Sequence, residues 1–185
     1  MFSKEKGGSM REEIRVMYSE SKVNQKVVEL AEQINKDYEG KRLHLICLLK
    51  GSIFFFCELA KRLNMPVTMD FMTVSSYGDS TQGSGTLKIK KDLEESIEGV
   101  DCLLVEDIID SGRTLSLTRK MLLERQPASL KLCTLLDKPD RREVEVPVDY
   151  IGFAIPDEFV VGYGLDYAQK YRNLPYIGIL DFVEE

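Results

Sequence analysis

Two adjacent carboxylates, Glu106 and Asp107, and the short polar loop after them are the residues of this chain best suited to chemistry. An apolar run ends at this pair, and Asp110, Ser111 and Gly112 follow after two isoleucines. A glycine-containing loop at a helix start presents free backbone N–H groups and the positive end of a helix dipole, which suit a phosphate. A carboxylate pair suits a sugar diol or a magnesium ion. The stretch therefore predicts a site for a phosphorylated ribose.

A sheet with helices on both faces is the predicted frame for this site. Apolar runs predict strands over residues 43–49, 67–74, 86–91, 100–106, 130–136 and 150–155, and helical spacing predicts helices over 23–38, 52–63 and 114–125. Residues 75–85, rich in Ser, Gly, Asp and Thr, are predicted to form a loop. Because strand and helix alternate from Leu43 to Leu136, we expect an α/β fold with a central, mostly parallel sheet. Ligands of such folds bind beyond the carboxyl ends of the strands.

Length and composition narrow the class of protein. With 185 residues, we expect one domain over residues 1–185, in which residues 1–11 are a mobile tail. The net charge of −6 argues against a general nucleic-acid or membrane-surface binder. The longest apolar runs, 45–49 and 53–57, are far shorter than the roughly 20 residues that span a bilayer. The first ten residues contain no apolar signal core, so secretion is not expected.

The cysteines and the single histidine give no sign of other chemistry. The four cysteines form no CxxC pair, and Cys47, Cys102 and Cys133 lie in apolar runs where cysteine packs as a small hydrophobe. Free thiols suit a reducing compartment, so we expect a cytoplasmic location. His44 lies in a predicted strand, where a hydrogen-bonded structural role is the plain interpretation. A Ser-His-Asp or Cys-His hydrolase is therefore disfavoured.

The sequence also resembles a known family. Residues Val105–Leu115, VEDIIDSGRTL, are similar to the phosphoribosyl-pyrophosphate motif of the type I phosphoribosyltransferases. Within that group, four further segments resemble the hypoxanthine-guanine phosphoribosyltransferases, in the family's order: Leu48–Ser52, Ser75–Gly78, Asp137–Arg142 and Asp157–Leu180. The resemblance covers about residues 14–180. It implies the family's fold, with a small hood and a flexible active-site loop.

The resemblance implies a purine salvage reaction. The family moves the 5-phosphoribosyl group from phosphoribosyl pyrophosphate to N9 of hypoxanthine or guanine, giving IMP or GMP and pyrophosphate, with Mg²⁺ as cofactor. For phosphoribosyl pyrophosphate it implies Lys50, Gly51, Glu106, Asp107, Asp110, Ser111, Gly112, Arg113, Thr114 and Arg172. For the purine it implies Lys138, Phe159, Val160 and Asp166; for the metal, Glu106, Asp107 and Asp166; and for the closing loop, Ser76 and Tyr77. It further implies that Asp110 is the general base near N7, that a cis peptide occurs at Lys50-Gly51, and that the protein is a homodimer or homotetramer.

Plainer interpretations of the same residues stay open. Asp110 could be a helix N-cap, Phe159 a core residue and Lys138 a surface lysine. Tyr163, Tyr167, Tyr171 and Tyr176 are taken as packing residues.

Two rival functions also stay open: a xanthine-preferring enzyme, and a nucleotide-sensing RNA-binding regulator on the same fold. The regulator needs a wide basic face. The one basic cluster, Lys138, Arg141 and Arg142, is short and has acidic neighbours. We therefore expect small-molecule substrates and neither nucleic-acid nor membrane partners.

Overall fold

A computed structural model describes residues 10–77 and 86–184 of the chain. Its elements are β1 (Met10–Tyr18), α1 (Glu20–Asp37), β2 (Leu43–Leu48), α2 (Ile53–Ala60), β3 (Val67–Tyr77), β4 (Thr86–Lys91), β5 (Asp101–Ile109), α3 (Arg113–Leu123), β6 (Ser129–Asp137), η1 (Pro139–Arg141), β7 (Tyr150–Ala154), β8 (Val160–Val161) and β9 (Ile177–Glu184). Six strands form the main sheet in the order β4-β3-β2-β5-β6-β7, parallel except for β4. The predicted α/β fold is confirmed.

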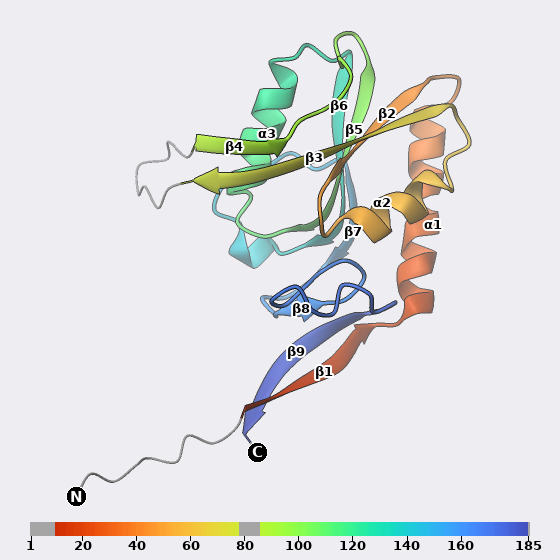
Figure 1. The fold of residues 1–185 in the computed structure, drawn as a ribbon. Helices are drawn as coiled ribbons and strands as arrows, with labels where there is room; N and C mark the ends of the chain where they lie inside the picture. The colour runs from red at the N-terminus through yellow and green to blue at the C-terminus, as the bar shows by residue number, and fades with distance from the viewer. Residues whose placement is uncertain (1–9, 78–85, 185) are drawn as a thin grey trace, which may run out of the picture.

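A second, three-stranded sheet of order β1-β9-β8 lies beneath the main sheet in Figure 1, and we call it the hood. The sequence pattern did not predict β1 or β9. The tail prediction was also too long, because Met10 and Arg11 pair with Glu184 and Val183; residues 1–9 lie outside the described residues. The two strands are mutual partners from opposite ends of the chain, so neither produces a strong local signal.

Two strands run further than predicted. β3 continues through Ser75 and Ser76 to Tyr77, because these residues pair with β4, so the predicted loop begins too early; residues 78–85 lie outside the described residues. β5 continues to Ile109 by pairing with β6, and the two carboxylates therefore lie inside the strand instead of ending it. In both places, pairing with the neighbouring strand keeps a stretch that contains polar residues in strand conformation.

The strands of the main sheet are apolar on both faces because helices cover both. In β2, Leu45 and Cys47 pack toward α1 and α2, whereas Ile46 and Leu48 pack toward α3. This alternation follows from the strand period of two, and it explains why the buried strands are continuous apolar runs. Cys47, Cys102 and Cys133 are buried, as expected.

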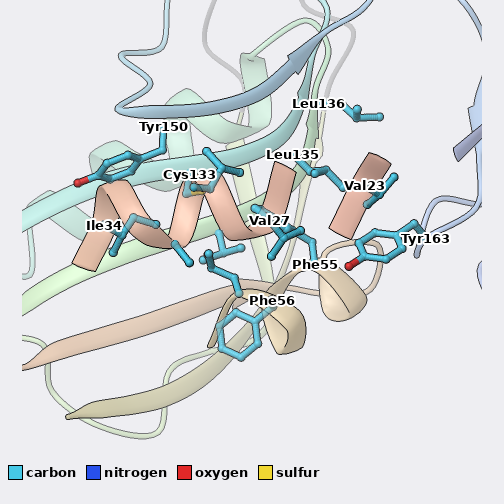
Figure 2. Packing of buried hydrophobic residues seen from close by; sticks show 14 of the residues in the cluster. Val23, Val27, Ile34, Phe55, Phe56, Cys133, Leu135, Leu136, Tyr150 and Tyr163 are labelled. Carbon is cyan, nitrogen blue, oxygen red and sulfur yellow. The ribbon is translucent and has the colours of Figure 1, made fainter. Parts of the chain in front are cut away.

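Helix α1 is built to cover one of these faces. Its buried residues, Val23, Val27, Leu30, Ala31 and Ile34, recur at helical spacing, and Ser19 caps its start by accepting a hydrogen bond from the backbone of Lys22. Burying each of the larger side chains stabilises the fold by roughly 1.5–3 kcal/mol. Figure 2 shows this cluster, which also contains Tyr163 from the segment beside the hood. The hood and the main sheet thus share one apolar core.

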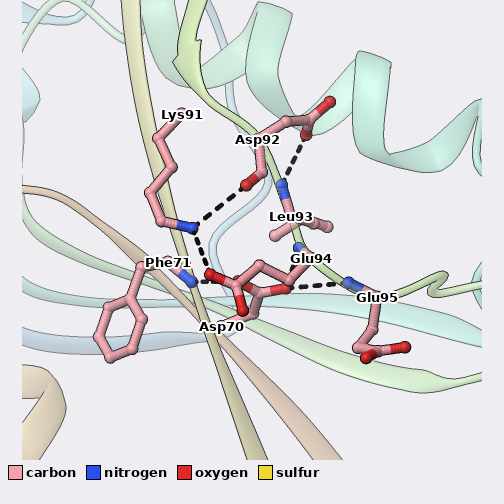
Figure 3. A network of polar contacts seen from close by, with 7 residues as sticks. All are labelled: Asp70, Phe71, Lys91, Asp92, Leu93, Glu94 and Glu95. Carbon is pink, nitrogen blue, oxygen red and sulfur yellow. Dashed lines mark hydrogen bonds and ion pairs between the residues drawn. The ribbon is translucent and has the colours of Figure 1, made fainter.

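A buried aspartate fixes the connection between β4 and β5 (Figure 3). The Asp70 side chain accepts hydrogen bonds from the backbone N–H groups of Phe71 (2.7 Å), Glu94 (2.7 Å) and Glu95 (3.4 Å). Asp92, in the same connection, pairs with Arg125 just after α3 at 2.8 Å. The arm formed by β3 and β4 is therefore tied to the helix that begins beside the polar loop.

Of the helices described, none combines the length and apolarity that a bilayer crossing requires.

Candidate active site

The loop between β5 and α3 lies at the carboxyl end of the sheet, where a ligand was expected. Gly112 occupies the N-cap position of α3 with a φ of +79°, and a Cβ atom there would stand 2.6 Å from the Val144 carbonyl oxygen. Only glycine tolerates both conditions. The Ser111 carbonyl accepts hydrogen bonds from the backbone N–H groups of Glu143 and Val144 at 3.0 and 3.1 Å. The outer side of the loop is thus fixed by residues 143–144.

The inner side of the loop opens on a pocket of about 220 Å³. Its polar lining comes from Glu106, Asp110, Ser111, Gly112 and Thr114. The Thr114 hydroxyl donates to the Ser76 hydroxyl at 3.0 Å, which joins the loop to the end of β3. Of the residues predicted to hold the phosphate, Ser111, Gly112 and Thr114 therefore line one cavity, and Arg113 is not part of its lining. Of the predicted closing residues, Ser76 is exposed and Tyr77 ends β3, with its side chain outside the description.

Asp110 does not cap the helix. The N-cap is Gly112, and the Asp110 side chain is 49% exposed at the pocket wall. Arg141 Nε donates to Asp110 Oδ1 at 3.2 Å, and Arg142 Nε donates to the Asp110 carbonyl at 3.3 Å. The capping alternative is wrong, and the carboxylate is free to meet a ligand on its open side.

The Arg113 side chain takes a direction that the sequence did not indicate. Its Nε donates to Glu143 Oε2 at 2.6 Å, and the guanidinium forms an ion pair with the same carboxylate. The backbone N–H of Arg113 stays at the loop, where it donates to Ser111 Oγ at 3.4 Å. In this arrangement the loop offers an anion N–H groups and hydroxyls, and the cation of Arg113 is already paired.

The two carboxylates of β5 touch different parts of the site. Glu106 lines the pocket, whereas Asp107, 9% exposed, lies against the backbone of Gly51. Burial raises the pKa of Glu106 well above its usual range, and repulsion from Asp107 adds to this. Burial also raises the pKa of Asp107, although the positive charge of Arg172 opposes the shift. A cation, or hydroxyl groups that donate hydrogen bonds, would stabilise the ionised form of such a pair.

The donor set fits Mg²⁺ bound together with a substrate. In the described part of the chain, no group of three or more His, Cys, Asp and Glu side chains could hold a metal. Mg²⁺ is commonly bound by one or two carboxylates and completes its octahedron with water and phosphate oxygens. The hard carboxylate oxygens of the adjacent Glu106 and Asp107 match that mode.

Lys50 and Gly51 lie just after β2, and the Gly51 backbone lies against Asp107. The cis peptide bond lies at Leu49-Lys50, one bond before the Lys50-Gly51 position that the resemblance implied. A Cβ atom on Gly51 would stand 1.5 Å from Asp107 Oδ2, and a Cβ atom on Gly164 would stand 1.8 Å from the Gly51 carbonyl oxygen. Three chain segments thus approach one another with no room for side chains.

The segment 164–172 completes this side of the site. Arg172 Nη1 donates to the Gly164 carbonyl at 2.7 Å, and Arg172 Nη2 lies 2.6 Å from Asp166 Oδ1. Gln169, which sequence reasoning missed, accepts a hydrogen bond from Lys50 Nζ at 3.4 Å. The structure therefore brings together the predicted residues Lys50, Gly51, Asp107, Asp166 and Arg172. Sequence reasoning also missed the close approach of Gly164 to the Gly51 backbone, although the GYG sequence at 162–164 signals it.

The predicted purine residues occupy the strand ends next to the loop. Lys138 is 7% exposed, its backbone N–H donates to the Ile109 carbonyl, and its Nζ lies 3.7 Å from Asp157 Oδ1. Phe159 is 50% exposed, and its ring meets Tyr167 edge-on. The interpretations of Lys138 as a surface lysine and of Phe159 as a core residue are both wrong. A buried cation and an exposed ring are the arrangement that a flat, polar ligand needs.

Several remaining expectations can be placed. Val160 is buried in β8, and His44 hydrogen-bonds through Nδ1 to Thr68 at 2.8 Å, the structural role expected of it. Tyr163 is buried, as expected of a packing residue. Of the basic cluster, Arg141 pairs with Asp110 and Arg142 with Asp137, which weakens its interpretation as a nucleic-acid face.

Comparison with known proteins gives one family. Residues 17–168 match the phosphoribosyl transferase domain. The chain is 51% identical over 178 residues to hypoxanthine phosphoribosyltransferase of Salmonella typhimurium, covering 95% of this chain and 100% of the relative. It is 48% identical to hypoxanthine-guanine phosphoribosyltransferase of Streptococcus thermophilus, over 90% of this chain and 92% of the relative. A solved hypoxanthine-guanine phosphoribosyltransferase of Bacillus anthracis, with HEPES in its active site, superposes with a TM-score of 0.86 at 48% identity, covering 90% of this chain and 99% of that one.

Proposed function

The chain belongs to the hypoxanthine-guanine phosphoribosyltransferases, and from that premise we propose how its residues carry out purine salvage. The reaction transfers the 5-phosphoribosyl group of phosphoribosyl pyrophosphate to N9 of hypoxanthine or guanine and releases pyrophosphate. One observation carries the assignment of roles. Glu106 lines the same pocket as the loop at the start of α3, and its neighbour Asp107 lies against Gly51 and near the cation of Arg172.

Phosphoribosyl pyrophosphate fits this order of groups. Ser111, Gly112, Arg113 and Thr114 hold the 5′-phosphate through backbone N–H groups and hydroxyls at the start of α3. Glu106 and Asp107 accept hydrogen bonds from the ribose hydroxyls. Lys50, the Gly51 backbone and Arg172 bind the pyrophosphate. Catalysis is then mainly positioning and stabilisation of the leaving group.

The bond changes need one proton acceptor on the protein. The bond from C1′ of the ribose to the pyrophosphate oxygen breaks, and its electron pair leaves with pyrophosphate. The lone pair of N9 forms the new bond to C1′, and the proton on N7 of the purine passes to the Asp110 carboxylate. The exposed, pocket-lining position of Asp110 supports this role.

Mg²⁺ is part of the proposal. Glu106 and Asp107 would hold the ion, and Asp166 would contribute a further carboxylate. When bound, the ion would supply positive charge that neutralises the leaving pyrophosphate. The Asp166 carboxylate also pairs with Arg172 and accepts a hydrogen bond from the Gln169 backbone N–H.

The choice of base follows from donors and acceptors. The Lys138 ammonium donates to the 6-oxo group of hypoxanthine or guanine, whereas the 6-amino group of adenine offers a second donor and no acceptor. Phe159 stacks on the purine ring, and the Val160 backbone binds the edge of the base. A xanthine preference would use the same Lys138 contact, so kinetics must rank the three oxopurines.

We propose one domain over residues 1–185, since the hood and main sheet share a core. Ser76 and Tyr77 close over the ligands and exclude water from the reacting sugar. A cytoplasmic location suits the four free cysteines, and we propose a homodimer or homotetramer that acts on small molecules without nucleic-acid or membrane partners.

A steady-state assay with phosphoribosyl pyrophosphate and Mg²⁺ tests the proposal, with hypoxanthine, guanine, xanthine and adenine offered in turn. Metal-dependent formation of IMP and GMP with little AMP is the expected result. A chelator should abolish the reaction, and added Mg²⁺ should restore it. Absence of product from every purine would overturn the proposed function.

A further inference from the structure

A turn within the pyrophosphate side of the site is held in a conformation that its residues disfavour. Tyr167 and Lys170 exchange two backbone hydrogen bonds, of 3.2 and 2.8 Å, around Ala168 and Gln169. These two central residues have φ of +49° and +68°, and Tyr171 follows with +75°. A hairpin turn of this kind usually carries Asn-Gly, because other L residues resist positive φ. The turn therefore needs support from elsewhere.

This turn leads directly into the groups that bind pyrophosphate. Arg172 follows it, and Gln169 within it accepts the hydrogen bond from Lys50. Asp166 Oδ2 accepts from the Gln169 backbone N–H at 2.8 Å, while Oδ1 pairs with Arg172. A shift of the turn would move the cation of Arg172 and the partner of Lys50 together.

The outside support comes from the first strand of the hood. The Glu12 carboxylate accepts a hydrogen bond from the Tyr171 hydroxyl and from Lys170 Nζ, the latter at 3.0 Å. In the sequence, Lys170 and Tyr171 lie 158 and 159 positions after Glu12. Glu12 is itself fixed, because its strand pairs with β9 at Phe182, whose ring packs against Tyr167 at 5.3 Å between centroids. The Glu12 carboxylate thus holds the C-terminal end of the turn through hydrogen bonds.

We propose that Glu12 is a positioning residue for pyrophosphate binding, acting through Tyr171 and Lys170 on the segment that carries Arg172. The inference rests on the proposed function of this site. Glu12 does not touch substrate. It holds the strained turn so that Arg172 and Gln169 are already placed when phosphoribosyl pyrophosphate arrives, which lowers the ordering cost of binding.

Two variants remove the contact from opposite sides. Glu12→Gln removes the negative charge, and Tyr171→Phe removes only the hydroxyl. Glu13→Gln is the matched control, because Glu13 is the next residue of β1 and its exposed carboxylate pairs with Arg11, two residues away. Each protein is compared by calorimetric titration with inorganic pyrophosphate and Mg²⁺, by KM for phosphoribosyl pyrophosphate and kcat, and by thermal unfolding.

Each single variant should raise the Kd for pyrophosphate and the KM for phosphoribosyl pyrophosphate about tenfold, the lower end of the effect of one lost hydrogen bond to a charged group. The kcat should change less than the KM, and Glu13→Gln should match the wild type. The double variant should bind little worse than Glu12→Gln alone, because the Tyr171 hydroxyl acts through Glu12. Unchanged Kd and KM in both single variants would overturn the inference, as would an equal effect in Glu13→Gln.

The outcomes separate this inference from the proposed function. If wild type makes nucleotide but the variants bind pyrophosphate normally, the function stands and the role of Glu12 is rejected. If wild type makes no nucleotide, the proposed function fails, and the pyrophosphate titration still decides the role of Glu12. Should Glu12→Gln fail to fold, Tyr171→Phe provides the same comparison, because it deletes a single oxygen atom.

Discussion

Gly51 and Asp107 are in such close contact that a Cβ atom at position 51 would stand 1.5 Å from the Asp107 carboxylate oxygen. The contact joins the loop after β2 to a buried acid of β5, and it places the Gly51 backbone beside the proposed pyrophosphate site. A side chain at position 51 would require the Asp107 carboxylate or the loop that carries Gly51 to move.

Gly51→Ala should therefore lower kcat/KM by about 100-fold or more, because displacing reacting groups by about 1 Å can slow a reaction by that factor. Steady-state kinetics check this expectation. Gly99→Ala is the control: Gly99 has a φ of +70° with nothing within 4 Å, and it precedes the far end of β5. That variant should lose roughly 1 kcal/mol of stability while keeping its turnover. Equal kinetics in the two variants would refute the close-contact argument.

Asp110→Asn should reduce kcat about 10²- to 10⁴-fold while phosphoribosyl pyrophosphate still binds, because the amide cannot take the N7 proton. Asp110→Ala should behave alike. Asp140→Asn, in the neighbouring exposed turn η1, should leave kcat unchanged. Rapid-quench kinetics and equilibrium binding measure the two steps separately. Near-normal kcat in Asp110→Asn would remove Asp110 from the role of general base.

Lys138→Met should reduce kcat/KM for hypoxanthine and guanine by about 10²-fold or more, because a site built to hydrogen-bond a group discriminates strongly when that bond is lost. The value for adenine should fall less, so the ratio of IMP to AMP formation should drop. Lys120→Met, on the exposed face of α3, serves as control. An unchanged ratio in Lys138→Met would show that another group reads the 6-position.

Asp37→Asn should make stability less dependent on acid pH. Hydrogen bonds from Tyr150 and then Lys131 lower the pKa of Asp37 below its ordinary value. A lowered folded-state pKa stabilises the fold above that ordinary value, about 4, and the gain is lost as the pH falls through the lowered pKa. The side chain is 43% exposed, so salt and water limit the effect to below about 1 kcal/mol.

Urea unfolding of wild type and Asp37→Asn at several pH values measures this difference. The wild type should be more stable at pH 7, and the two curves should converge below about pH 4. Glu39→Gln, an exposed neighbour after α1, should follow the wild type. If the difference in stability between the two proteins persisted at low pH, the effect of Asp37 would not come from its ionisation.

Much of the site was predictable from local sequence, because local rules govern it. Glycine and hydroxyl residues after an apolar run predict an anion loop, and Gly112 indeed opens α3 with positive φ. The order of buried strands and helices from Leu43 to Leu136 followed from apolar periodicity in the same way. A partner that is distant along the chain could not be predicted: nothing in the local sequence indicated that the Arg113 guanidinium pairs with Glu143.

The sequence by itself determined the α/β class and, through its motifs, the family, and it predicted the proposed phosphate loop beside the acidic pair, because each of these rests on runs, spacings and motifs of residues close together along the chain. The tertiary structure alone decided that β1 and β9 pair, that Glu106 and Asp107 touch different parts of the site, and that Glu12 reaches Tyr171. The physical reason is distance along the chain. A contact between residues 159 positions apart leaves no periodicity or spacing in either segment, and only the folded backbone brings the two groups together.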